Sequence, residues 1–365
     1  MGTVILLLIL RAPETNRDLI TSISRLAALP VTMIGRGSRY CLLFRPLADF
    51  ILAPLLALQY FTWKPARILT WWSIPRPRRL LYGTGSKEVL HIFEAPGAAS
   101  SDRFDCCVLV HGGAWGSGFP RLYYGAAMGA AKVVKSKFSI LVEYPVYPDA
   151  TVLEQADCVA RALSTIQREF GDGIGIILVG HSSGANIAAL ALLEAGRAEK
   201  PRMAVAAFLA LSGVFDIRSH FAWESKRGVE QLSPMAAAAG GDETGWESCS
   251  PTLVVRQWSS AAASVASFMP RILLLHGRND ATVPYTSSQE FGDALRDVQC
   301  ASVEEAYLPD VEHTDPIYAL METSEKKKQC SVVAAIESFL EDGPMERDRL
   351  LLKSPDSSNL TRVMT

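Results

Sequence analysis

The sequence predicts an α/β fold built on a mostly parallel, doubly wound sheet. From Leu80 onward, short apolar runs rich in β-branched residues alternate with longer segments of helical spacing. This β-α-β-α-β order is typical of a parallel sheet that helices cover on both faces. The chain has 365 residues, 49% of them hydrophobic, so it is long enough to bury a sizeable core.

Each element of this sheet follows from its local pattern. Short apolar runs predict buried strands, and apolar residues that recur every three or four positions predict helices. We expect strands at 88–94, 106–110, 138–143, 174–180, 203–211, 271–275 and 302–307. We expect helices at 122–135, 151–170, 287–295 and 328–340, and an Ala-rich helix after Gly184.

A sharp turn joins the strand at 174–180 to this Ala-rich helix. The turn reads Gly-His-Ser-Ser-Gly at 180–184, and strand, turn and helix together are the context in which G-x-S-x-G presents a nucleophile. The turn forces its central residue, Ser182, into a strained backbone conformation, and the flanking glycines leave room for the neighbouring chain. Ser182 is therefore the candidate nucleophile, and the alternative is an ordinary loop.

A nucleophilic serine needs a base that takes its proton, and the chain offers few. His313 follows the last predicted strand and precedes a helical stretch, and the carboxyl end of a parallel strand is where such sheets place active residues. The other five histidines lie within a strand, at strand ends, inside the sharp turn or in an irregular segment: His91, His111, His276, His181 and His220. His313 is the candidate base, and the alternative is a surface histidine.

The acid that orients the base is expected between serine and histidine in the chain, since folds of this kind run in that order. Asp280 meets this condition, because it follows the apolar strand at 271–275 in the stretch HGRNDATVP. It would accept the imidazole N–H and stabilise the imidazolium. The alternative is a turn or helix cap ahead of Pro284.

The third requirement is a set of backbone N–H groups that binds the oxyanion formed on the attacked carbonyl. The stretch His-Gly-Gly-Ala-Trp at 111–115 follows the predicted strand at 106–110, and its glycines let the backbone approach a substrate closely. We expect the donors to come from Gly112, Gly113 and Ala114, together with the N–H of Ser183.

The regular pattern fails between residues 215 and 268. This stretch includes AAAAGG at 236–241, and polar residues surround its tryptophans. Long irregular insertions in compact folds are usually lids or disordered segments. We therefore expect a cap over the site within an 80–341 domain, with a partly disordered tip.

Residues 1–79 form a separate basic and apolar region. Residues 1–80 hold eleven Lys/Arg against three Asp/Glu, a charge of +8, so the net charge of −2 leaves −10 on the rest. The stretch 47–63 is 17 residues long, at the lower limit for a spanning helix, and contains Asp49 and Pro54. Basic and aromatic residues flank it, as at a membrane interface, so we expect membrane association. The alternative is a pair of amphipathic helices packed on the rest of the protein.

The remaining composition bounds the other partners. The seven cysteines are scattered without a C-x-x-C pair or zinc-like spacing, so we expect mostly buried thiols, no disulfide framework and no metal. We also expect no organic cofactor and no nucleic-acid partner. Residues 342–365 form a polar tail, and the sequence does not indicate an oligomeric state.

These motifs together resemble those of a known family. The stretches HGGAW at 111, GHSSGA at 180, HGRNDATVP at 276 and EHTD at 312 resemble the α/β-hydrolases of the hormone-sensitive-lipase and esterase group. The likeness covers residues 80–340. Within that group, LYG at 81, LSGVFD at 211 with HF at 220, LSP at 232 and HTD at 313 are similar to the prenylcysteine (isoprenylcysteine) methylesterase-like enzymes.

The resemblance implies an α/β-hydrolase fold, a Ser182–Asp280–His313 triad, and demethylation of isoprenylcysteine methyl esters at endoplasmic reticulum or Golgi membranes. The chain departs from the family where Glu143-Tyr144-Pro145 replaces Asp-Tyr-Arg, and in its Ala/Gly-rich insertion. The sequence thus predicts a serine carboxylesterase for a small or lipidated ester. The alternatives are an arylformamidase or peptidase on the same fold, or a non-catalytic receptor for a small ligand.

Overall fold

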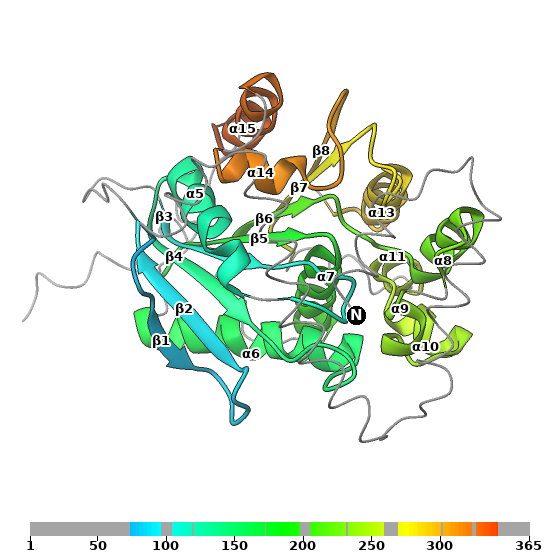
Figure 1. Ribbon diagram of the computed structural model, residues 1–365, viewed down its shortest axis with the longest axis horizontal. Coiled ribbons are helices and arrows are strands. Elements are labelled where there is room, and N and C mark those ends of the chain that lie inside the picture. The colour runs from blue at the N-terminus through cyan, green and yellow to red at the C-terminus, as the bar shows by residue number, and fades with distance from the viewer. Residues whose placement is uncertain are drawn as a thin grey trace, which may run out of the picture.

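The core of the protein is an eight-stranded sheet of order β1-β2-β4-β3-β5-β6-β7-β8 (Figure 1). The computed structural model describes residues 74–95, 104–118, 120–171, 173–197, 205–230, 233–258, 269–300, 302–322 and 326–341. The strands are β1 Arg78–Leu81, β2 Val89–Glu94, β3 Phe104–Val110, β4 Ser136–Glu143, β5 Ile176–His181, β6 Val205–Leu211, β7 Arg271–Gly277 and β8 Val303–Leu308. Strands β3 to β8 run parallel, and β1 and β2 join antiparallel at one edge, which confirms the mostly parallel sheet.

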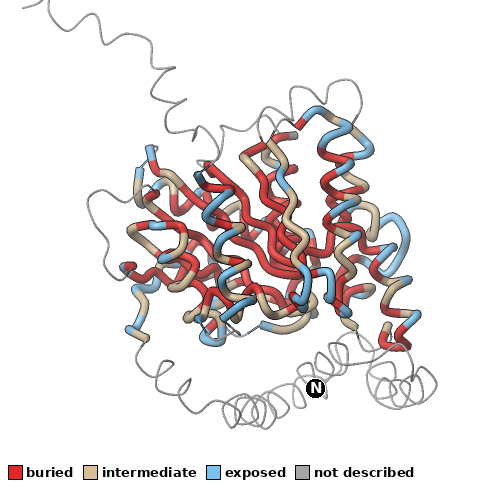
Figure 2. The backbone as a smooth tube through the Cα atoms, turned by 90° about the horizontal axis from the view of Figure 1, so that it is seen from above, coloured by how far each residue is buried: buried red, intermediate tan, exposed pale blue. Residues whose placement is uncertain are grey.

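Helices cover both faces of this sheet, so its central strands β3, β5, β6 and β7 are buried on both sides (Figures 1 and 2). Alternate residues of β3 enter opposite cores, with Val108 on one face and Leu109 on the other. The first face packs against α6 Val152–Phe170, α7 Ser183–Arg197 and α13 Thr286–Asp297. The second packs against α5 Tyr124–Val134, α14 Asp315–Leu320 and α15 Lys326–Glu341.

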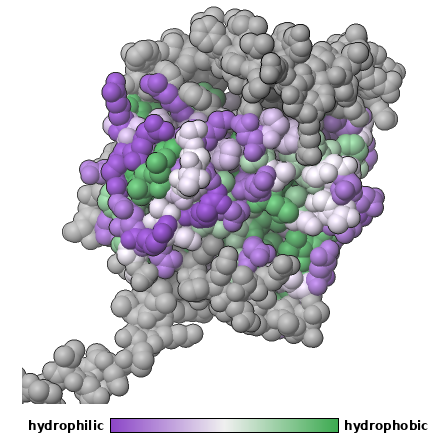
Figure 3. All heavy atoms as spheres, turned by 90° about the horizontal axis from the view of Figure 1, so that it is seen from below, coloured by the Kyte–Doolittle hydropathy of each residue, from purple (hydrophilic) through white to green (hydrophobic). Residues whose placement is uncertain are grey.

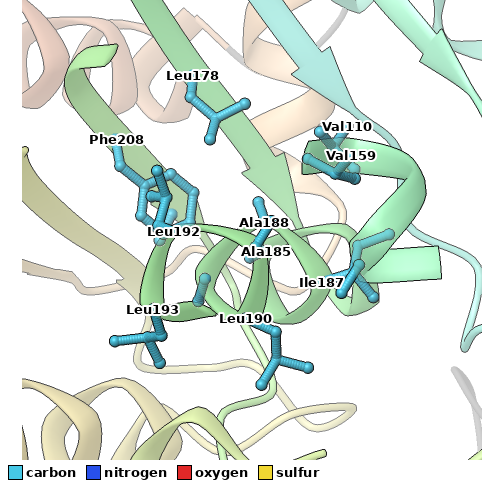
Figure 4. Close-up of a cluster of buried hydrophobic side chains, with 14 of the residues drawn as sticks. Val110, Val159, Leu178, Ala185, Ile187, Ala188, Leu190, Leu192, Leu193 and Phe208 are labelled. Atoms are coloured by element: carbon cyan, nitrogen blue, oxygen red, sulfur yellow. The ribbon is translucent and has the colours of Figure 1, made fainter. Parts of the chain in front are cut away.

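Small residues let α7 lie close to the first face. Figure 4 shows Val110, Leu178 and Phe208, from β3, β5 and β6, gathered over Ala185 and Ala188 of this helix. All of these side chains are buried. Because α7 starts at the residue after Ser182, this packing fixes the position of the sharp turn.

Helix α6, the longest in the described part of the chain, shows how local sequence sets the ends of an element. Thr151 caps its N-terminus, and Thr151 and Glu154 each bond the other's backbone N–H in a capping box. The helix ends at Gly171, whose φ is 98°. The predicted helix at 122–135 divides into a 3₁₀ turn, η2 Pro120–Tyr123, followed by α5.

Strand β1 begins at the end of a Pro-Arg-Pro-Arg stretch, residues 75–78. Arg78 begins this strand and lies opposite Ile92 of the antiparallel β2. Edge strands often carry charged residues and an adjacent proline, because one side of the strand bonds to no neighbour. The start of such an edge strand can therefore have the same proline-rich, charged composition as a linker, and sequence composition does not distinguish the two.

Much of the 215–268 insertion, where the regular sequence pattern fails, is helical. It contains α8 Ile217–Arg227, α9 Met235–Ala238, α10 Glu243–Ser248 and α11 Pro251–Arg256. Helices of four to six residues are too short to show a helical period, so the pattern is lost although the helices form. Residues 259–268 of this insertion lie outside the described residues.

Several predictions lie outside the described part of the chain. The membrane segment at 47–63, the rest of residues 1–73 and the tail at 342–365 all do so. Across the described ranges, none of the helices combines the length and apolar character needed to cross a bilayer. The described cysteines are free thiols: Cys106, Cys107, Cys158, Cys249, Cys300 and Cys330.

The surface of the described chain is mixed rather than uniformly polar. Figure 3 shows one face on which hydrophobic patches lie among hydrophilic residues. Three large apolar side chains are exposed among the described residues, Leu81, Leu122 and Leu153. Exposed apolar residues scattered in this way are ordinary for a folded surface and do not themselves mark a site.

Helix α5 packs against α14 at Gly129. A Cβ atom at this position would lie 1.7 Å from the carbonyl oxygen of Leu320, the last residue of α14. Because α14 begins two residues after His313, this contact supports the segment that carries the candidate base.

Replacing Gly129 tests this contact. We expect Gly129→Ala to lower the free energy of unfolding by about 1–3 kcal/mol, because backbone must move to admit the methyl group. Gly173→Ala is the matched control, since a Cβ there meets nothing within 4 Å, and its effect should stay within about 0.5 kcal/mol. Chemical denaturation measures both, and equal stabilities would contradict the proposed packing.

Candidate active site

The turn after β5 holds Ser182 in the strained conformation that its sequence predicts. Ser182 has a φ of 55°, and its N–H donates to the carbonyl of Leu211 at the end of β6. A Cβ at Gly180 would lie 2.6 Å from the Cα of Ala185, and one at Gly184 would lie 2.3 Å from the carbonyl oxygen of His111. Both flanking positions therefore require glycine.

The structure brings Ser182, His313 and Asp280 into one hydrogen-bonded line. His313 Nε2 lies 3.0 Å from Ser182 Oγ, and His313 Nδ1 lies 2.8 Å from Asp280 Oδ2. The three residues follow β5, β8 and β7, whose carboxyl ends meet at the same edge of the parallel sheet. Asp280 accepts the Nδ1–H, so His313 Nε2 is the acceptor that faces the serine hydroxyl.

Every oxygen of the Asp280 carboxylate is engaged. Oδ1 accepts the backbone N–H groups of Thr282 and Val283 at 2.9 and 2.8 Å, and Oδ2 faces His313 and His276. Burial alone would raise the pKa of this carboxyl. The charge of His313 and the hydrogen bonds from both histidines outweigh burial and hold the Asp280 pKa well below its usual range.

The loop that carries His313 is held at two points. The N–H of Glu312 donates to the carboxylate of Asp315 at 2.8 Å. His181 Nε2–H donates to the carbonyl oxygen of His313 at 2.9 Å. Burial, followed by the nearby charge of His313, lowers the pKa of His181 to about 3, so this ring stays neutral and serves as a donor.

The loop after β3 lies directly against Ser182. A Cβ at Gly112 would lie 3.0 Å from Ser182 Cβ and 2.8 Å from the carbonyl oxygen of His181. The next three residues, Gly113, Ala114 and Trp115, all have positive φ. Successive backbone N–H groups in a tight turn can form a concavity that binds an anion.

Two aromatic rings and two polar side chains hold this loop. The His111 ring stacks between Tyr123 and Tyr144, at centroid distances of 5.3 and 4.4 Å. The Tyr144 hydroxyl donates to the His111 carbonyl at 2.6 Å. Trp115 Nε1 donates to Asn186 of α7, and the Gln155 side chain donates to the Trp115 carbonyl. Burial lowers the pKa of His111 to about 4, so its ring is neutral near pH 7.

The cap is bonded to the loop that carries the acid. On α8, Trp223 Nε1 donates to the carbonyl of Ala281 at 3.1 Å, and Arg227 Nη1 donates to the carbonyl of Thr282 at 3.4 Å. From α7, Asn186 Nδ2 donates to the Cys249 carbonyl within the cap at 3.0 Å. Helix α7 and the loop that carries Asp280 are thus both hydrogen-bonded to the cap.

Sequence reasoning missed the supporting residues of this site. His276 precedes Asp280 by four positions and Asn186 follows Ser182 by four, but only the packed structure shows what each contacts. Their proximity to the predicted site residues in the sequence is the one signal that could have indicated them. Within the described ranges, no group of three or more His, Cys, Asp or Glu side chains is arranged to hold a metal ion.

Comparison with known proteins gives related sequences. A probable isoprenylcysteine alpha-carbonyl methylesterase of Oryza sativa subsp. japonica is 27% identical over 296 residues, 75% of this chain and 64% of that protein. The isoprenylcysteine alpha-carbonyl methylesterase of Arabidopsis thaliana is 28% identical over 57% of this chain and 50% of its own length. The chain thus spans between half and two thirds of these relatives.

Solved structures share the fold. Esterase B from Lactobacillus Rhamnosis has a TM-score of 0.57 at 16% identity, covering 80% of this chain and 94% of that protein. A hormone-sensitive lipase from a metagenome library has a TM-score of 0.57 at 18% identity, covering 73% of this chain and 87% of that protein. The BD-FAE family model matches residues 90–295, more than half of the sequence. The chain therefore belongs to the BD-FAE family and has an α/β-hydrolase fold.

Proposed function

We propose that this protein is a serine hydrolase that cleaves carboxylic esters through Ser182, His313 and Asp280. The observation that carries the proposal is the continuous hydrogen bonding from Ser182 Oγ through His313 to Asp280, at 3.0 and 2.8 Å. This order of groups is what a serine nucleophile requires. The names of the related sequences, which are methylesterases and an esterase, support it.

The geometry supports a two-step mechanism. His313 Nε2 takes the Ser182 proton as Oγ attacks the ester carbonyl, and the Asp280 carboxylate stabilises the resulting imidazolium. The N–H groups of Gly113, Ala114 and Ser183 would bind the oxyanion, with Gly112 providing the close approach to Ser182. His313 then protonates the leaving alcohol, and the acyl group stays on Ser182 Oγ. In the second step His313 takes a proton from water, which attacks this acyl-enzyme and releases the carboxylic acid.

For the substrate we propose an isoprenylcysteine methyl ester. Support comes from the names of the plant relatives and from the motifs that resemble this family. A triad on this fold also cleaves amides when the pocket admits them, so arylformamides and peptides are the enzymatic alternatives. A non-catalytic receptor is less well supported, because the base and its acid remain in bonding position.

The nucleophile is tested by Ser182→Ala. We expect this variant to lower kcat on p-nitrophenyl butyrate by about 10⁴-fold or more, since no other hydroxyl bonds to His313 among the described residues. Ser164→Ala, on the exposed side of α6, is the control and should retain wild-type kcat. Measuring kcat/KM on farnesylcysteine methyl ester, an arylformamide and a peptide amide then ranks the candidate substrates. Equal rates for wild type and Ser182→Ala would exclude the proposed nucleophile.

The acid is tested by Asp280→Asn. We expect kcat to fall by about 10⁴-fold, because the amide no longer holds His313 in the required tautomer. Since the Asp280 pKa is depressed in the folded state, its stabilising effect is present above about pH 3.9 and is lost as pH falls toward the folded value. The stability gap between wild type and variant, measured by denaturation, should therefore narrow in acid. Full activity of Asp280→Asn would contradict its role.

We further propose that residues 1–79 associate the protein with a membrane, as the 17-residue apolar stretch and its basic flanks suggest. The resemblance to prenylcysteine methylesterases points to the endoplasmic reticulum or Golgi. Full-length protein should sediment with membranes, and deletion of residues 1–73, which stops before β1, should release it. Recovery of full-length protein in the supernatant without detergent would contradict this.

A further inference from the structure

We propose that His276 and Ser288 extend the triad into a chain of five residues, in which His276 is a positioning residue for the Asp280 carboxylate. This inference rests on the proposed function, because it concerns how the acid of that site acts. The chain runs from Ser288 through His276, Asp280 and His313 to Ser182.

His276 lies near the carboxyl end of β7, the strand that precedes Asp280. It is the sixth residue of β7, is fully buried, and has a partner for each ring nitrogen. Nε2 lies 3.1 Å from Asp280 Oδ2 and 3.0 Å from the carbonyl oxygen of Val283. Nδ1 lies 2.7 Å from Ser288 Oγ on α13.

These partners determine the tautomer of His276. A carbonyl oxygen only accepts, so Nε2 must carry the hydrogen that faces Val283 and Asp280. In the neutral ring Nδ1 is then an acceptor, and the Ser288 hydroxyl is the donor that matches it. Ser288 thereby keeps the N–H of His276 directed at the acid.

The hydrogen bond from His276 changes how Asp280 interacts with His313. Oδ2 accepts hydrogen bonds from both His276 and His313, while Oδ1 is held by two backbone N–H groups. The carboxylate therefore cannot rotate, and part of its charge is balanced by His276 rather than by His313. His276 both orients the acid and limits how strongly it stabilises the His313 imidazolium.

The neighbouring groups bear on any pH effect. Besides the members of this chain, the charged and titratable groups beside it among the described residues are His181 of β5 and Arg227 of α8. His181 stays neutral, and Arg227 bonds the carbonyl of Thr282 rather than the carboxylate. Asp280 Oδ2 has two side-chain donors, His313 and His276. Replacing His276 therefore removes one donor and leaves the bond to His313 in place.

The test is the pH dependence of Ser182 labelling by a fluorophosphonate, which needs neutral His313 but no known substrate. In His276→Leu we expect labelling at neutral pH to slow about tenfold, the scale for outer residues that orient a reactive group. The pH of half-maximal labelling should rise by about 0.5–1 unit, because Asp280, with one donor fewer, stabilises the His313 imidazolium more. His276→Gln keeps an N–H near the Nε2 position and should restore the wild-type midpoint.

Two further variants make the test decisive. His91→Leu removes another buried histidine with two partners, Glu143 and Tyr124, and should leave the midpoint unchanged. If His276→Leu does not fold, Ser288→Ala decides, with a smaller shift in the same direction. An unmoved midpoint in His276→Leu, or in Ser288→Ala when it decides, would overturn the inference. Wild-type protein that is not labelled at Ser182 would instead overturn the proposed function.

Discussion

The buried carboxylate of Asp280 is the constraint on which the arrangement of this site depends. A charge removed from water is tolerated only when hydrogen bonds replace its hydration. Two backbone N–H groups and two histidines do so here. Meeting this requirement fixes the 280–283 turn and brings the loops after β7 and β8 together, and the second of these loops carries His313.

The parallel sheet makes that meeting possible. Ser182, Asp280 and His313 are far apart in the chain, but they follow β5, β7 and β8 at the edge where the carboxyl ends of these strands converge. Strain at Ser182 is maintained by close packing on both sides, because neither Gly180 nor Gly184 has room for a side chain. The cap is part of the same construction, since α8 bonds the carbonyls of the acid turn. A movement of α8 would therefore displace the turn that holds Asp280.

Local patterns predicted the parallel sheet, its order of strands and helices, and the placement of Ser182, since long apolar runs and a glycine-flanked turn have strong local signatures. Chain order added His313 and Asp280, whose bonding to each other is a property of the folded sheet. The edge strand β1 and the short cap helices were missed because four to six residues are too few to show a period. The roles of His276 and Asn186 depend on contacts across α13 and the cap, which no local pattern encodes.

The central claim is that Ser182, its base and a set of backbone donors converge on one reacting atom. A crystal structure of the fluorophosphonate adduct tests this most directly. The account predicts phosphorus bound to Ser182 Oγ, with the phosphoryl oxygen about 2.7–3.1 Å from the N–H groups of Gly113 and Ser183. An adduct on another residue, or a phosphoryl oxygen turned away from both N–H groups, would contradict it.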